Sequence, residues 1–264
     1  EKNKMFTKKS FIERKLRGLA FRIFNKIENN GNANFEQNGE KVFTDNLFNS
    51  FKNGGGVVFD IGANVGDYAQ MIVDKSAQSN VSVKIHLFEP TKSCFAIISS
   101  KFQNKENITL NNFGVSNSDD VATIFYDKEE SGLASLYQRN LDSYDLKLNQ
   151  SEEIKLRRLD DYIEEKYISH IDFIKIDIEG HELKAFEGFG KYLNSNFIDY
   201  IQFEYGGANL DSHSSLMEIY KLLSNSGFKI AKVMPNGLEL REYSPFMDNF
   251  NYSNYVAISN KVVS

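Results

Sequence analysis

The sequence has 264 residues, and its 31 basic and 36 acidic side chains give a formal net charge of -5. Hydrophobic residues make up 41% and charged residues 25%, which is typical of a soluble globular protein with one large α/β domain or two small ones. A single cysteine, Cys94, excludes an internal disulfide, and the lack of a signal peptide or of an apolar run of roughly 20 residues predicts a cytoplasmic protein.

The first 27 residues differ from the rest of the chain in charge. They carry nine basic and two acidic side chains, a net charge of +7, which leaves -12 on the remaining 237 residues. Apolar side chains recur at the spacing of one helical face, with most of the basic side chains off that face. The apolar set is Ile12, Leu16, Leu19, Ala20, Ile23, Phe24 and Ile27.

This predicted basic helix has three interpretations. In the first, the helix lies on an anionic membrane surface. In the second, its apolar stripe docks on the domain or on a second subunit. In the third, it binds polyphosphate or nucleic acid. Nucleic acid is the least favoured, because a domain of net charge -12 repels phosphate backbones. We therefore expect residues 5–27 to mediate a homo-oligomer or a peripheral contact with the inner face of the membrane.

Residues 28–39 are polar and rich in Asn and Gly, which predicts a linker. We therefore divide the chain into an extension over 1–39 and one domain over 40–264, with a short helix around 45–51. From residue 57, strands alternate with helices, which is typical of a mostly parallel sheet covered on both faces. We expect strands at 57–61, 84–89, 108–110, 173–178, 200–204, 229–233 and 255–259, edge or hairpin strands at 121–126 and 153–157, and helices at 68–75, 92–102, 181–192 and 214–224.

A glycine-rich loop, Asp60-Ile61-Gly62-Ala63-Asn64-Val65-Gly66, follows the first of these strands. It lacks the G-x-G-x-x-G spacing of dinucleotide sites. It also lacks the Gly-Lys-Ser/Thr sequence that a nucleotide-binding P-loop requires. The carboxylate of Asp60 is a poor neighbour for a pyrophosphate but a good one for a cationic ligand. The loop therefore favours a cationic ligand with an amino-acid part.

An acidic residue, Glu89, ends the second predicted strand, 23 residues beyond Gly66 and directly before Pro90. At this position of a doubly wound sheet a carboxylate accepts hydrogen bonds from both ribose hydroxyls of a nucleoside. The two segments together predict a ligand that has a ribose and a positive charge and needs no phosphate cradle. S-adenosylmethionine is such a ligand. A tight turn with a solvated Glu89 is the alternative.

Four segments of the chain together resemble the FkbM-type family of S-adenosylmethionine-dependent methyltransferases. They are Val58–Gly66, Leu87–Pro90, Asn112–Asn117 and Phe173–Glu182, and the similarity extends from about residue 56 to 205. The resemblance implies a Rossmann-like α/β fold with a seven-stranded sheet and, most often, O-methylation of a hydroxyl on a sugar or related secondary metabolite. It also implies the cofactor-binding residues Asp60, Gly62, Asn64, Gly66, Glu89, Pro90, Asn112 and Phe113, with Glu89 at the ribose and Asn112 and Phe113 near the adenine.

The last of these segments carries ionisable residues at the end of a strand. Asp177 and Glu179 alternate along one face, and Gly180 allows the turn before His181. Methyl transfer to a hydroxyl requires an aligned oxygen and a group that takes its proton. His181 has a suitable pKa, which we expect a helix N-terminus to lower, and Glu204 at the end of the next strand is a second base candidate.

Alternatives remain open at this site. Asp177 and Glu179 would orient the acceptor or favour the sulfonium, while Glu182 and Lys175 have purely structural interpretations. A divalent ion held by Asp177, Glu179, Glu204 and His181 is compatible with the sequence, but we favour metal-independent chemistry. The loop over residues 131–135 is either a lid or an ordinary surface loop.

The predicted function is transfer of a methyl group from S-adenosylmethionine to a hydroxyl of a sugar in a surface glycan or secondary metabolite. An N- or carboxyl-methyltransferase on the same fold is one alternative. A non-catalytic nucleoside-binding module of a glycan-assembly complex is the other.

Overall fold

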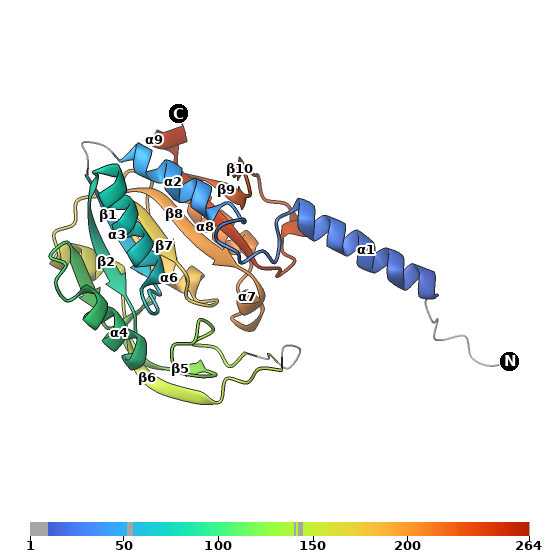
Figure 1. The fold of residues 1–264 in the computed structure, drawn as a ribbon, viewed down its shortest axis with the longest axis horizontal. Helices are drawn as coiled ribbons and strands as arrows, with labels where there is room; N and C mark the ends of the chain where they lie inside the picture. The colour runs from blue at the N-terminus through green and yellow to red at the C-terminus, as the bar shows by residue number, and fades with distance from the viewer. Residues whose placement is uncertain (1–9, 52–54, 140, 142–144, 264) are drawn as a thin grey trace.

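The computed structural model describes residues 10–51, 55–139, 141 and 145–263 and contains two β-sheets (Figure 1). The larger sheet has eight strands in the order β10-β9-β11-β8-β7-β1-β2-β3, of which β3, β2, β1, β7 and β8 run parallel and β11 is antiparallel to both neighbours. Its strands are β1 (Gly55–Ile61), β2 (Ser82–Phe88), β3 (Ile108–Asn111), β7 (Ile171–Ile176), β8 (Ile198–Tyr205), β9 (Phe228–Met234), β10 (Gly237–Leu240) and β11 (Ser253–Ser259).

This architecture confirms the predicted mostly parallel α/β fold, but the predicted number of seven strands is wrong. The eighth strand is β10, which pairs antiparallel with β9 through Gly237 opposite Met234. Only Pro235 and Asn236 separate the paired ends, and Gly237 has φ +137°, a conformation that favours glycine. Four residues of mixed polarity are too short for periodicity to reveal such an edge strand.

Helices cover both faces of the large sheet, and each face has its own hydrophobic cluster. One face carries α2 (Glu40–Ser50), α3 (Asp67–Ser79) and α4 (Lys92–Phe102), and the other carries α5 (Leu159–Glu165), α6 (Glu182–Gly188) and α8 (Leu216–Asn225). Short elements complete the chain: η3 (Gly190–Tyr192), α7 (Gly207–Asp211), η4 (Pro245–Met247) and α9 (Asn260–Val263). The predicted helix over 181–192 is therefore α6 followed by η3, and α2 begins five residues before the predicted 45.

A second, three-stranded sheet lies beside the end of the large one (Figure 1). It consists of β4 (Gly114–Val115), β5 (Asp120–Tyr126) and β6 (Gln150–Arg157) in the order β4-β6-β5. The hairpin predicted from 121–126 and 153–157 is confirmed as the antiparallel pair β5–β6. Ile124, Ile154 and Leu156 form a small apolar cluster of their own on this sheet.

The N-terminal helix α1 (Phe11–Ile27) extends away from the rest of the chain (Figure 1). None of its residues is buried, and its one ring contact with the domain joins Phe24 to Phe246. The linker after it lies against β9, because Asn29 Nδ2 donates to the Val233 carbonyl at 3.0 Å and Lys232 Nζ donates to Asn30 Oδ1 at 2.6 Å. The division at residue 39/40 stays a prediction. None of the described helices is long and apolar enough to cross a membrane.

Candidate active site

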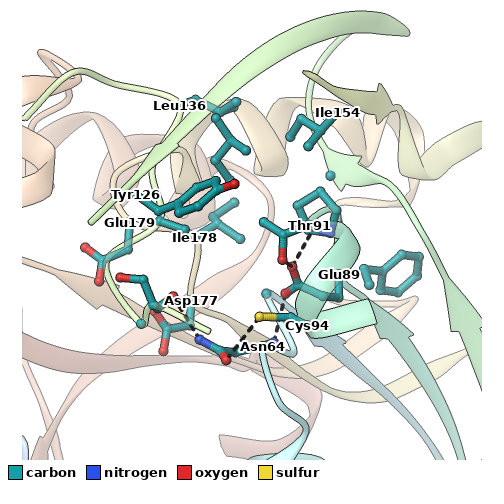
Figure 2. A pocket seen from close by; sticks show the side chains of 18 of the residues that line it. Asn64, Glu89, Thr91, Cys94, Tyr126, Leu136, Ile154, Asp177, Ile178 and Glu179 are labelled. Atoms are coloured by element: carbon teal, nitrogen blue, oxygen red, sulfur yellow. Dashed lines mark hydrogen bonds between the residues drawn. The ribbon is translucent and has the colours of Figure 1, made fainter. Parts of the chain in front are cut away.

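A pocket opens where the C-terminal ends of β1, β2 and β7 face the three-stranded sheet (Figure 2). Ligands of doubly wound sheets bind at these strand ends. The glycine-rich loop, the Glu89 segment and the acidic motif after β7 form one wall. The opposite wall comes from β5, β6 and the segment between them. The two walls differ in chemistry. The first carries the polar side chains of Asn64, Glu89, Asp177 and Glu179, and the second contributes an apolar patch of Ile124, Ala134, Leu136, Ile154 and Leu156 together with Lys128, Glu130 and Ser131.

Gly62 allows the glycine-rich loop to approach the acidic motif closely. It has φ +86°, and a Cβ built on it would lie 1.9 Å from the carbonyl oxygen of Asp177. Its N–H donates to the Phe88 carbonyl at 2.9 Å. A side chain here would separate the ends of β1 and β7, so the glycine fixes the shape of this wall. Gly66, with φ +76°, precedes α3 and does not line the pocket.

Glu89 lines the pocket and is bonded to the loop beside it (Figure 2). Its Oε2 accepts the Asn64 N–H at 2.9 Å, and its Oε1 accepts the backbone N–H and the hydroxyl of Thr91 at 2.8 and 2.6 Å. Burial raises the pKa of Glu89, while these hydrogen bonds lower it. Because each carboxylate oxygen has two lone pairs, Oε2 keeps capacity for a ligand hydroxyl.

Asp60 is buried and does not itself line the pocket, although the next two residues, Ile61 and Gly62, do. Within the described part of the chain its Oδ2 has no hydrogen-bond partner. Burial raises its pKa to about 7, with Lys175 opposing and Asp177 and Glu89 reinforcing the shift. An unpartnered buried carboxyl oxygen beside two further carboxylates fits a cationic ligand, so these residues suit the positive charge and ribose of S-adenosylmethionine.

The buried ammonium of Lys175 joins the carboxylates behind the pocket. Its Nζ lies 3.3 Å from Asp177 Oδ2 and 3.6 Å from Glu204 Oε1. Glu204 also accepts the Tyr252 hydroxyl at 2.8 Å and does not line the pocket.

A divalent ion held by Asp177, Glu179, Glu204 and His181 is not supported. Among the residues that the structure describes, only His170, Asp172 and Asp199 approach one another at metal-ligand spacing, and the Lys175 ammonium already supplies a cation between Asp177 and Glu204.

Glu179 faces the pocket from a strained turn. Its φ is +50°, and the next residue, Gly180, has φ +98°. A Cβ built on Gly180 would lie 2.6 Å from the carbonyl oxygen of Ala208. Arg139 Nη1 donates to Glu179 Oε2 at 2.5 Å. Burial and the Asp177 carboxylate raise the pKa of Glu179 to about 8, against the lowering effect of Arg139. This turn therefore places the Glu179 carboxyl at the pocket.

His181 lines the pocket, but both of its ring nitrogens have partners. Nδ1 lies 2.8 Å from the Tyr137 hydroxyl and Nε2 lies 2.9 Å from Ser116 Oγ. Burial, more than any helix N-terminus, lowers its pKa to about 4, with Lys184 adding to the effect. With both ring nitrogens engaged, none is left over for an acceptor hydroxyl.

Glu182 has a structural role. Its Oε1 accepts the N–H groups of Ile178 and Gly180 at 3.3 and 3.2 Å, which braces the turn that carries Glu179.

The segment over 127–139 covers the pocket and is tied to the opposite wall by side-chain contacts. Asn64 Nδ2 donates to the Ser131 carbonyl at 3.1 Å, and Ser135 Oγ donates to the Glu179 carbonyl at 2.8 Å. Tyr137 and Arg139 add the contacts to His181 and Glu179. Residues 131–135, predicted as a lid or a surface loop, therefore lie over the site.

Two residues expected near the adenine do not line the pocket. Asn112 Nδ2 donates to the carbonyls of Glu89 and Pro90 at 2.9 and 3.1 Å, and Phe113 packs in the core against Phe88. Gly114 and Val115, directly after them, do line it, as does Pro90. The contact of Asn112 and Phe113 with adenine stays a prediction.

Comparison with known proteins connects this geometry to a family. The model of the methyltransferase FkbM domain matches residues 60–230, which include both the glycine-rich loop and the acidic motif. The chain belongs to the FkbM methyltransferase family. Members of this family are S-adenosylmethionine-dependent methyltransferases, so that cofactor is assigned to the site. A search of curated proteins gives no match.

A solved structure agrees with the FkbM fold. Methyltransferase FkbM from Methylobacillus flagellatus is 15% identical, with a TM-score of 0.50 over 81% of this chain and 48% of that one, so this chain spans about half of its length. At this identity the likeness shows the fold alone. A TehB-like methyltransferase from Corynebacterium glutamicum is 8% identical, with a TM-score of 0.42 over 94% and 96% of the two chains.

Sequence reasoning missed four polar residues that shape the site of this FkbM protein: Ser116, Tyr137, Arg139 and Asp211. Arg139 Nε lies 3.4 Å from Asp211 Oδ2, so this arginine links the covering segment to α7. No spacing rule marks these residues, because they come from loops that meet only in the folded chain.

Proposed function

We propose that this FkbM protein methylates a hydroxyl oxygen of an acceptor, with S-adenosylmethionine as the methyl donor. The observation that carries the proposal is the pair Asp177 and Glu179, two carboxyl groups that line the same pocket as Glu89 and lie next to the buried Asp60. Such a set offers the hydrogen-bond acceptors that a hydroxyl and its departing proton require.

When bound, S-adenosylmethionine supplies an electrophilic methyl group on a sulfonium. The residues that would hold it are Glu89 for the ribose hydroxyls and Asp60 with the glycine-rich loop for the cationic end. Asp177 is our choice for the group that accepts the hydroxyl proton, because it lines the pocket and its side chain is 37% exposed. Lys175 holds this carboxylate in place at 3.3 Å.

Glu179 and His181 have positioning roles in this proposal. Glu179 is partly buried against Arg139 and orients the acceptor from the side of α7. His181 joins the covering segment to the motif through Tyr137 and Ser116, so it keeps the pocket closed over the acceptor. Glu204 acts through Lys175, since it does not line the pocket.

A sugar in a surface glycan or secondary metabolite is the acceptor that we propose. Sugar rings present an apolar face and a rim of hydroxyls, and the pocket offers an apolar wall with Tyr126 opposite a carboxylate wall. A cytoplasmic location, where activated sugars and S-adenosylmethionine are both available, belongs to the same proposal.

The test is a transfer assay with methyl-labelled S-adenosylmethionine and a panel of nucleotide sugars, oligosaccharides, amines and carboxylic acids. We expect S-adenosylhomocysteine to form together with a product whose mass increases by one methylene at a sugar hydroxyl. Label on amines or carboxylic acids alone would favour the N- or carboxyl-methyltransferase. Binding of the cofactor without transfer to any class would favour the non-catalytic module.

A further inference from the structure

The basic helix α1 presents an apolar stripe that the described part of the chain leaves uncovered. Its members Ile12, Leu16, Leu19, Ile23 and Ile27 are each 50–67% exposed. The helix has a defined start, because Ser10 and Glu13 form a capping box with bonds of 2.7 and 3.2 Å. An uncovered stripe of this length on a well-capped helix is a binding surface that needs an occupant.

The opposite side of α1 carries cations without acidic partners. At 100° per residue, Arg14, Arg17 and Arg22 lie about 100–180° from the centre of the apolar stripe, whereas Lys15 and Lys26 flank the stripe at about 60–80° from its centre. Within the described residues none of these five basic side chains forms an ion pair. Lys15 instead lies over the ring of Phe11, 4.5 Å from its centroid, and Arg22 Nε donates to the Gly18 carbonyl.

We propose that α1 binds in the plane of an anionic lipid bilayer, with the apolar stripe in the acyl boundary and the cations among the headgroups. Helices that bind in this way combine a basic polar face with an apolar face of Leu, Ile and Phe and need no membrane-spanning length. Charge complementarity favours this occupant, because a segment of net charge +7 is attracted to an anionic surface.

A second copy of the chain is a poorer match. Pairing two α1 helices would bring two strongly basic segments together. The catalytic domain of another copy is acidic, but it lacks a matching apolar face: the large apolar side chains exposed elsewhere in the described chain are scattered singly over separate elements. They are Val42, Val121, Tyr167, Leu210, Met217, Leu240, Phe246 and Val262.

Vesicle co-sedimentation of the full chain tests this proposal. The probes are vesicles of phosphatidylcholine and phosphatidylglycerol in equal parts, and vesicles of phosphatidylcholine alone. We expect binding to the anionic vesicles at least about tenfold stronger than to the neutral ones, and weakened when the ionic strength rises to about 1 M, where charges are screened within about 3 Å.

A matched pair of variants separates the stripe from net charge. Ile23→Glu puts a carboxylate in the apolar stripe, and Phe21→Glu makes the same charge change on the other side of the helix, at a similarly exposed residue (50% and 53%). Ile23→Glu should reduce vesicle binding by about tenfold or more, and Phe21→Glu should reduce it by less than about threefold. Both variants should keep the melting temperature of the domain, since neither position is buried.

Three results would overturn the proposal: no binding of the wild-type chain to anionic vesicles, equal losses in the two variants, or a dimer in solution that Ile23→Glu dissociates while no vesicle binding is seen. The vesicle assay does not depend on methyl transfer, so its outcome and that of the transfer assay are independent.

Discussion

The two walls of the pocket are built in different ways. The motif wall, formed by the ends of β1, β2 and β7, is fixed by backbone contacts such as the approach of Gly62 to the Asp177 carbonyl and the bond from the Gly62 N–H to the Phe88 carbonyl. The covering wall, formed by β5, β6 and the segment 127–139, reaches the motif wall through side chains of Ser135, Tyr137 and Arg139.

This difference separates two tasks. The motif wall carries the buried carboxyl groups and has the geometry that the chemistry requires, so small changes there should be severe. The covering wall is attached by a few polar bonds, each worth on the order of 1 kcal/mol, so changes there should act mainly on acceptor binding. The predictions below use substitutions that fall on one wall or the other.

The largest expected effect is on turnover at the motif wall. Asp177→Asn keeps the shape of the side chain but removes the proposed proton acceptor, so kcat should fall by about 10²–10⁴-fold while the affinity for S-adenosylmethionine stays within about threefold. Steady-state kinetics and calorimetry check both values. Asp120→Asn, on the exposed edge of β5, should leave both unchanged. If Asp177→Asn turns over at the wild-type rate, the proton goes to another group.

Stability offers a second contrast, with one glycine on each wall. Gly62→Ala places a Cβ 1.9 Å from the Asp177 carbonyl oxygen at a positive φ, so it should lower the free energy of unfolding by about 2–4 kcal/mol. Gly132→Ala on the covering segment meets nothing within 4 Å and should change it by less than about 0.5 kcal/mol. Denaturant unfolding measures both. Similar changes in the free energy of unfolding for the two variants would show that the motif wall is no more constrained than the covering wall.

The covering wall should show a smaller effect, with a different kinetic signature. Tyr137→Phe removes the hydroxyl that contacts His181 but keeps the ring, a loss of about 1 kcal/mol, or about fivefold. We expect this loss in KM for the acceptor, with kcat and cofactor affinity nearly unchanged. A fall in kcat as large as that of Asp177→Asn would give Tyr137 a direct part in the reaction.

The last contrast concerns pH and the buried Asp60. Its pKa is raised by burial from 3.8 to about 7, so the folded protein keeps a proton that the unfolded chain has already lost. The free energy of unfolding that this proton contributes is fully present below the pKa that Asp60 has in the unfolded chain. It is lost as the pH rises through the pKa that Asp60 has in the folded protein.

The Asp60→Asn variant has no ionisable group at this position. The melting temperature of the variant should therefore fall less than that of the wild type between about pH 4 and pH 8. Thermal unfolding over this interval provides the measurement. The same variant should bind S-adenosylmethionine more weakly, because the unpartnered carboxyl oxygen is gone. Parallel pH profiles for the two proteins would mean that Asp60 does not titrate in this interval.

Sequence periodicity was sufficient to predict most strands of the large sheet and the strand ends that form the motif wall. The strand ends at Ile61, Phe88 and Ile176 lie side by side because β1 pairs with both β2 and β7, and this follows from the parallel α/β pattern. The glycine-rich loop with Glu89 already indicated S-adenosylmethionine, and the family resemblance agreed with it.

Long-range contacts explain what the sequence did not predict. Helix α2 begins at Glu40, earlier than expected, because Gln202 and Asn254 donate hydrogen bonds to its buried carboxylate from strands far along the chain. The partners of His181 were also missed, since Ser116 and Tyr137 lie in irregular segments that no periodic pattern describes. Both cases depend on residues that meet only after folding.

Calorimetric titration of the folded protein with S-adenosylmethionine and S-adenosylhomocysteine tests the central claim most directly. Saturable binding of both ligands at one site, weakened by Asp60→Asn and unchanged by Asp120→Asn, is the result that the two-walled pocket predicts. The absence of binding heat for either ligand, with a protein that melts cooperatively, would contradict it.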